Sequence, residues 1–149
     1  MWNNLLRLLK HPEERQQITG DEAIATILVR AAKTDGIYTN SEKTLIEKLL
    51  ITQMNVPKDK VSALRLTAET LEKEINDNVQ LTRVIKKEIE YEDRKELIIQ
   101  LWQIIMDDDM RTPEENKLMR VITHLLGVSD LESAKARSKA LSLIKKRTE

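Results

Sequence analysis

The fold is decided by a stretch that reads LVRAAKTDGIYTNSEKTLIEKLL, residues 28–50. A second stretch, LWQIIMDDDMRTPEENKLMRVIT at residues 101–123, has the same pattern. Each stretch has an aspartate, then a threonine four positions later and a glutamate seven positions later: Asp35, Thr39 and Glu42, then Asp108, Thr112 and Glu115. Apolar residues flank both copies at helical spacing. We therefore predict a helix–loop–helix unit with an acidic loop that the chain uses twice.

The composition predicts an all-α protein. A chain of 149 residues fits one domain. It has only 3 glycines, 3 prolines and no phenylalanine, and this composition favours helices over sheets. Charged residues make up 34% of the chain, which suits the solvated outer faces of helices. We expect a single-domain bundle of seven or eight helices, with the repeated unit at about residues 21–55 and 93–128.

Local signals divide the chain into these helices. Proline after His11, glycine after Asp35, proline after Val56 and the Asn-Asp-Asn run at 76–78 are the expected breaks, together with Gly127. The expected helices start at Thr19 and Thr39, cover about residues 58–75, 81–89, 92–106 and 113–126, and end with one that Ser129 caps. Nothing in the pattern predicts a strand.

The composition also argues against several functions. With 25 basic and 25 acidic residues, no overall field attracts nucleic acid or a membrane surface. The absence of cysteine removes disulfides, thiolate catalysis and cysteine-type metal sites. The sequence has no glycine-rich phosphate loop, no serine with an evident general base and no zinc-type spacing. We therefore expect no enzyme, no catalytic residue and no cofactor-binding residue. Without a membrane span or a signal-peptide core, the cytoplasm is the expected compartment.

Helix capping accounts for half of each acidic loop. In a capping box, a threonine side chain accepts a hydrogen bond from the third helical residue, and a glutamate at that residue reaches back to the threonine amide. Thr39 and Glu42 have this spacing, as do Thr112 and Glu115. Pro113 suits the first helical position, where its missing N–H is not needed. Capping therefore explains these two threonines and two glutamates without any further function.

Capping does not explain the aspartates. Asp35 and Asp108 follow helix C-termini, where the helix dipole disfavours an anion by a few tenths to about 1 kcal/mol. Asp108 also lies between Asp107 and Asp109, and Asp109 takes the position that Gly36 holds in the first copy. A nearby cation would stabilise such a cluster. It could be a lysine or arginine side chain or a hard divalent ion. The spacing is not that of an EF-hand, so solvated caps and a cation site both stay open.

The residues of the two stretches resemble a known family. The pattern A-A-x-x-D-G-x-Y-T-x-x-E at residues 31–42, its echo in the second stretch and a closing LLGVS at 125–129 are similar to the TerB-like domain. That family includes the tellurite-resistance protein TerB and the related N-terminal region of DjlA-type co-chaperones. The likeness covers about residues 21–132. It implies an all-helical domain with internal pseudo-two-fold symmetry and an acidic cluster to which both motifs contribute.

Carried onto this chain, the resemblance places the acidic cluster at Asp35, Glu42, Asp108 and Glu115. Because hard divalent ions prefer such oxygen clusters, these four are the expected ligands of a Ca²⁺ or Mg²⁺ ion, with Asp107 and Asp109 as additional candidates. Asp109 departs from the glycine that is usual at its position and adds negative charge to the second loop.

Two functions follow as expectations. The first is a non-enzymatic TerB-like module, in tellurite or other stress resistance, that binds a divalent cation or a basic partner through its acidic loops. The alternative is a co-chaperone-like interaction scaffold that binds a protein partner through its terminal helices and uses the acidic loops only as helix caps.

The two ends of the chain carry separate signals. Residues 1–18 read as an amphipathic helix and linker in front of a helical domain over 19–149. An apolar stripe near the start could pack on the domain, bind a partner or lie at the inner face of a membrane through residues 1–10; it consists of Trp2, Leu5, Leu6, Leu8 and Leu9. The basic stretch over 135–147 reads as a solvated helix face or as a contact for anionic partners such as RNA or lipid headgroups.

Overall fold

The described chain consists of α-helices joined by short loops. The computed structural model describes residues 18–107 and 112–148, and no strand occurs in these two segments. The predicted N-terminal amphipathic helix, with Trp2 and the leucines that follow it, lies outside the described residues. In the described part of the chain, no helix has the length and apolar character needed to cross a bilayer.

Seven helices make up this part of the chain. They are α3 (Gly20–Lys33), α4 (Asn40–Met54), α5 (Val61–Glu74), α6 (Asn78–Glu88), α7 (Tyr91–Ile105), α8 (Pro113–Leu125) and α9 (Asp130–Thr148). The prediction of an all-α domain is confirmed. Both predicted helix–loop–helix units are present, as α3–α4 and α7–α8, while the pseudo-two-fold relation between them stays a prediction.

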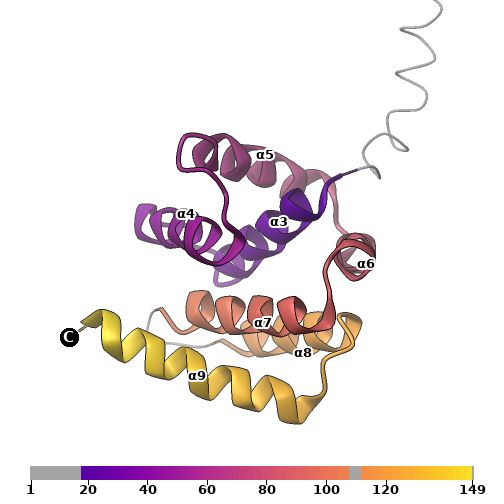
Figure 1. Cartoon of the computed structure of the whole chain (residues 1–149), viewed down its shortest axis with the longest axis vertical. Coiled ribbons are helices and arrows are strands. Elements are labelled where there is room, and N and C mark those ends of the chain that lie inside the picture. Colours follow the sequence, from indigo (N-terminus) through magenta and orange to yellow (C-terminus); the bar gives the residue numbers. More distant parts are fainter. Residues whose placement is uncertain (1–17, 108–111, 149) are drawn as a thin grey trace, which may run out of the picture.

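The helices form two layers. Figure 1 shows α3, α4 and α5 together on one side and α7, α8 and α9 on the other, with α6 at the edge between them. Contacts between the layers run from α3 and α4 to α7, and α9 lies along α7. The two predicted acidic loops, one after α3 and one after α7, therefore belong to different layers.

Helix α7 is the centre of the core. Every residue of its last nine, from Leu97 to Ile105, is buried, including Gln100 and Gln103. A helix that is buried on all its faces needs neighbours all round it. Helices α3, α4, α6, α8 and α9 all contact α7 and supply that cover.

Most predicted boundaries lie within a few residues of the observed ones. Two helix starts differ by three residues: α5 begins at Val61 and not at about residue 58, and α6 begins at Asn78 and not at Leu81. Helix α6 begins earlier because Asp77 caps it by accepting a hydrogen bond from the Val79 amide at 2.8 Å. The predicted stop at Gly127 is confirmed by its left-handed φ of 73°. Ser129 caps α9 as predicted, since its hydroxyl accepts a hydrogen bond from the Glu132 amide at 3.1 Å.

Arg30 of α3 joins three helices. Its guanidinium donates to the Asn78 side chain at 2.7 Å, to the Glu72 carbonyl at 3.1 Å and to the Ile75 carbonyl. Its Nε also lies 3.3 Å from the Glu72 carboxylate. The last carbonyls of a helix have no partner within it, so Arg30 satisfies the end of α5 and holds the start of α6.

Replacing Arg30 should therefore destabilise the fold. We expect Arg30→Met to lower the free energy of unfolding by about 2–4 kcal/mol, because it removes charge-assisted hydrogen bonds and leaves two carbonyls without a partner. Arg120→Met on the exposed side of α8 is the matched control and should stay within about 0.5 kcal/mol of wild type. Equal urea midpoints for the two variants would contradict this role of Arg30.

Candidate functional site

The first acidic loop is a tight turn built around Asp35. The Asp35 carboxylate accepts a hydrogen bond from the Ile37 amide at 2.9 Å, a turn that aspartate commonly forms. Gly36 between them has a φ of 86°, a left-handed conformation that glycine adopts without strain. The turn ends α3 and leads into Thr39 at the start of α4.

Both predicted capping boxes are present. The Glu42 amide donates to the Thr39 hydroxyl at 3.1 Å, and the Thr39 amide donates to the Glu42 carboxylate at 2.9 Å. In the second copy, the Glu115 amide donates to the Thr112 hydroxyl at 3.1 Å, and the Thr112 amide donates to the Glu115 carboxylate at 2.8 Å. Pro113 occupies the first position of α8, as predicted.

The two capping glutamates differ in their surroundings. Glu42 is half-buried at the edge of a surface hollow, whereas Glu115 is only 3% exposed. The local sequence signal is the same at both positions, so the difference comes from how α4 and α8 pack. Glu115 holds the start of α8 from inside the domain and does not line the hollow.

Three of the predicted carboxylates meet in that hollow. It has a volume of about 300 Å³ and lies between the loop after α3 and the C-terminal end of α7. Its lining consists of Asp35, Ile37, Thr39, Ser41, Glu42, Ile104 and Asp107. We call it the acidic hollow. Asp108 and Asp109 lie outside the described residues.

The acidic hollow has the oxygen atoms that hard cations prefer but not a closed coordination shell. Carboxylates come from both loops, and two hydroxyl groups, of Thr39 and Ser41, lie beside them. Within the described segments, no three acidic or histidine side chains are already arranged to hold a metal ion. Loop carboxylates would have to move toward a common point to enclose one.

Tyr38 ties the first loop to α5. Its hydroxyl donates to the Glu69 carboxylate at 2.5 Å. Arg65 donates to the same carboxylate at 2.5 Å and to Glu47 of α4 at 2.6 Å. The Lys43 ammonium lies 5.1 Å from the centre of the Tyr38 ring, within the range of a cation–π contact. The loop that carries Asp35 is thus fixed to two helices.

This network changes the titration of its members. Burial and the hydrogen bond with Glu69 raise the pKa of Tyr38 well above its ordinary value. Burial alone would raise the pKa of Glu69, but the hydrogen bonds from Tyr38 and Arg65 outweigh it and lower that pKa below its usual 4.5. The phenol stays protonated and the carboxylate stays ionised across neutral pH.

Sequence reasoning found the carboxylates but not the parts that position them. Ile37, Ser41 and Ile104 also line the acidic hollow, but no local sequence pattern marks them as site residues. Tyr38 was part of the quoted motif, yet its role depends on Glu69, which is 31 residues away. The only local signal for this network is the spacing of Arg65 and Glu69, which puts them one helical turn apart.

The comparisons with known proteins agree with this architecture. The fold and the hollow define a class of protein: a helical domain with an acidic loop after α3 and another after α7. The family model described as "Tellurite resistance protein TerB" matches residues 21–138. The chain therefore belongs to the TerB family, which confirms the resemblance. No curated protein and no solved structure gives a significant match.

The Tyr38 tether gives a direct test. We expect Tyr38→Phe to lower the free energy of unfolding at pH 7 by about 1 kcal/mol, because a charge-assisted hydrogen bond is lost. Tyr91→Phe is the control: Tyr91 is 38% exposed, and in the described part of the chain its hydroxyl makes no hydrogen bond. A Tyr38 variant as stable as the Tyr91 variant would show that the tether contributes nothing.

The same network predicts an acid dependence. Because the pKa of Glu69 is lowered in the folded state, its contribution is fully present above about pH 4.5 and is lost as the pH falls further. Tyr38→Phe removes one cause of the lowering, so urea midpoints measured from pH 6 down to about pH 3 should fall less steeply in this variant. Parallel curves for wild type and Tyr38→Phe would contradict the assignment.

Proposed function

We propose that this protein is a non-enzymatic TerB-family module that binds a divalent cation in the acidic hollow and acts in tellurite or other stress resistance. The observation that supports this most is the meeting of Asp35 and Glu42 with Asp107, which follows α7 in the other layer of the fold. Carboxylates that repel one another gain from a shared counter-ion. Neither loop needs this composition for capping alone, since Thr and Glu already provide the caps.

Calcium suits the acidic hollow better than magnesium. Calcium accepts irregular sets of carboxylate, hydroxyl and carbonyl oxygens at about 2.3–2.6 Å, whereas magnesium demands a near-ideal octahedron at about 2.0–2.1 Å. The hollow is open on one side and its carboxylates are not yet gathered. An ion that tolerates a loose arrangement is therefore the better candidate. Ile104, which is 3% exposed, would screen it partly from water.

A titration of the full chain tests the cation. We expect Ca²⁺ to give saturable shifts at the backbone amides of Asp35 to Ile37 and of Asp107. Asp35→Asn combined with Asp107→Asn should weaken the affinity by at least about tenfold, since two negative charges are lost from the hollow.

Asp59→Asn combined with Asp93→Asn makes the same change in net charge at two exposed sites and is the matched control. Its affinity should equal that of wild type. If Ca²⁺, Mg²⁺ and Mn²⁺ all fail to give saturable shifts up to millimolar concentration, the cation proposal is wrong.

One observation favours a second ligand, a basic side chain of a partner protein. Ile37 is 62% exposed beside Asp35, and a lysine or arginine could lay its apolar stem on Ile37 while its charge meets the carboxylates. Ile37→Ser separates the two ligands: it should reduce recovery of a partner but leave the Ca²⁺ affinity unchanged. Partner recovery that survives both Ile37→Ser and Asp35→Asn would favour the scaffold alternative, in which the acidic loops are only caps.

A further inference from the structure

A face that is both basic and apolar lies where α6 packs beside α8. A hollow of about 190 Å³ between these helices is lined by Val79, Thr82, Arg83, Lys86 and Leu125. Val79, Arg83 and Lys86 are exposed, and their spacing of four and then three residues puts them on one side of α6. Helix α6 therefore presents two cations and an apolar side chain together.

Helix α8 extends this face with a second stripe. Lys117 and Val121 precede Leu125 at intervals of four residues, so the three lie along one side of the helix. Val121 is 37% exposed and Val79 is 39% exposed, which leaves a valine uncovered on each helix. We call the two stripes the α6–α8 face, which consists of Val79, Arg83, Lys86, Lys117, Val121 and Leu125.

The cations of the α6–α8 face are not neutralised by the described residues. The ion pairs in this part of the chain involve none of Arg83, Lys86 and Lys117. Lys86 suits the last turn of α6, where the helix dipole favours a cation, but Arg83 and Lys117 lie outside the last turns of their helices. Arg83 and Lys86 are also one turn apart and repel each other. An anionic surface would relieve this repulsion.

The N-terminal segment joins the domain beside α6. The Gly20 amide donates a hydrogen bond to the Glu88 carboxylate at 2.5 Å, which fixes the start of α3 at the end of α6. Figure 1 shows these two helices next to each other at the edge of the domain. Residues 11–17 have a reach of up to about 23 Å, more than the diameter of a helix, which is about 10 Å. Residues 1–10 and the α6–α8 face can therefore contact one surface at the same time.

The sequence of residues 1–10 has the same two chemical characters as the α6–α8 face. Its apolar residues recur at the spacing of one helix side: Trp2, Leu5, Leu6 and Leu9. Arg7 and Lys10 fall on the other side at this spacing. Tryptophan and leucine opposite basic residues are typical of segments that lie in the interface of a bilayer.

We propose that residues 1–10 and the α6–α8 face together bind the surface of a bilayer that carries anionic lipids. The bilayer interface takes up the apolar stripe, and the lipid headgroups attract Arg83, Lys86 and Lys117. Membrane affinity grows with the buried apolar area and with the attraction to anionic lipids, so a ten-residue segment binds more firmly when a basic patch contacts the same surface.

The charges and the apolar stripe favour a bilayer over other occupants of the face. Residues 1–10 docked on the face itself would bring Arg7 and Lys10 against cations of the same sign. A nucleic acid would neutralise the charges but leave Trp2 and the leucines in water. A bilayer without anionic lipids would leave the cations of the face without a partner.

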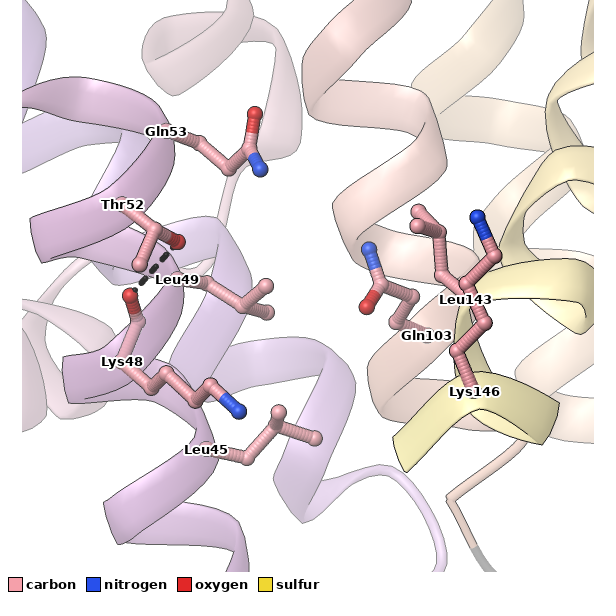
Figure 2. Close-up of a pocket in the computed structure, with 8 residues that line it drawn as sticks. All are labelled: Leu45, Lys48, Leu49, Thr52, Gln53, Gln103, Leu143 and Lys146. Carbon is pink, nitrogen blue, oxygen red and sulfur yellow. Dashed lines mark hydrogen bonds between the residues drawn. The ribbon is translucent and has the colours of Figure 1, made fainter. Parts of the chain in front are cut away.

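The proposal is independent of the proposed cation site. The α6–α8 face shares no residue with the acidic hollow. It is also separate from a larger hollow, whose residues Figure 2 shows on facing walls, those of α4 on one side and those of α7 and α9 on the other. Lys48 and Lys146 of that hollow are exposed cations outside the face and can serve as controls.

Flotation of the full chain with lipid vesicles, in buffer without divalent ions, tests the proposal. We expect the chain to float with vesicles of phosphatidylcholine that contain about one third phosphatidylglycerol. Its affinity for pure phosphatidylcholine vesicles should be at least about tenfold weaker, because the attraction to the headgroups is lost. Raising the salt from about 0.05 to about 0.5 M should also release it, since salt screens this attraction.

A charge variant tests the part of the face. Arg83→Gln, Lys86→Gln and Lys117→Gln combined should weaken binding to the anionic vesicles by at least about tenfold. Lys48→Gln, Lys58→Gln and Lys146→Gln remove the same charge from exposed positions outside the face and are the matched control. The control should weaken binding much less than the face variant. Thermal melts establish that both variants are folded.

An apolar variant tests the part of residues 1–10. Leu6→Ser with Leu9→Ser should weaken binding by at least about tenfold, because two leucines no longer enter the interface. Asn3→Ser with Asn4→Ser changes two polar positions of the same segment and should bind like wild type.

Four results would overturn the proposal. They are the absence of binding to anionic vesicles, equal affinity for neutral vesicles, equal losses in the two charge variants, and unchanged binding after the leucine substitutions. A duplex RNA that binds while the vesicles do not would assign the face to nucleic acid instead.

Discussion

The burial of α7 is the constraint on which the rest of the structure depends. Nine consecutive residues, Leu97–Ile105, are withdrawn from water, and five other helices provide the cover. Apolar packing fixes the position of α7 even though it buries a polar group. Gln100 is 1% exposed, and its amide has no hydrogen-bond partner among the described residues, which costs free energy. Burial of large aliphatic side chains contributes about 1.5–3 kcal/mol each, which outweighs one poorly satisfied amide.

The acidic hollow follows from where α7 ends. Its C-terminus brings Ile104 and Asp107 against the loop of Asp35, which completes the acidic hollow. Tyr38 fixes the first loop to α5 through its hydrogen bond with Glu69. The end of the central helix thus completes the hollow in which we propose that a cation binds.

The local parts of this architecture could be predicted from the sequence, and the long-range parts could not. Capping boxes at Thr39 and Thr112 need only four residues each, so their spacing was enough. The convergence of Asp35 with Asp107 depends on how two layers pack, which no local pattern encodes, and only the family resemblance led to the expectation of a cluster from both motifs. The same limit explains Glu115: its signal matches that of Glu42, but α8 turns it inward and leaves it 3% exposed. The contact of Tyr38 with Glu69 was missed for this reason too.

The central claim is that one ion is shared by two loops from different layers of the fold. Substoichiometric Mn²⁺ tests it most directly, because a paramagnetic ion broadens the amide signals of every residue near it. The account predicts that the signals of Gly36 and Ile37 in one loop and of Asp107 in the other lose intensity together, and that excess Ca²⁺ restores both. Broadening of one loop without the other, or broadening that Ca²⁺ does not reverse, would contradict the shared site.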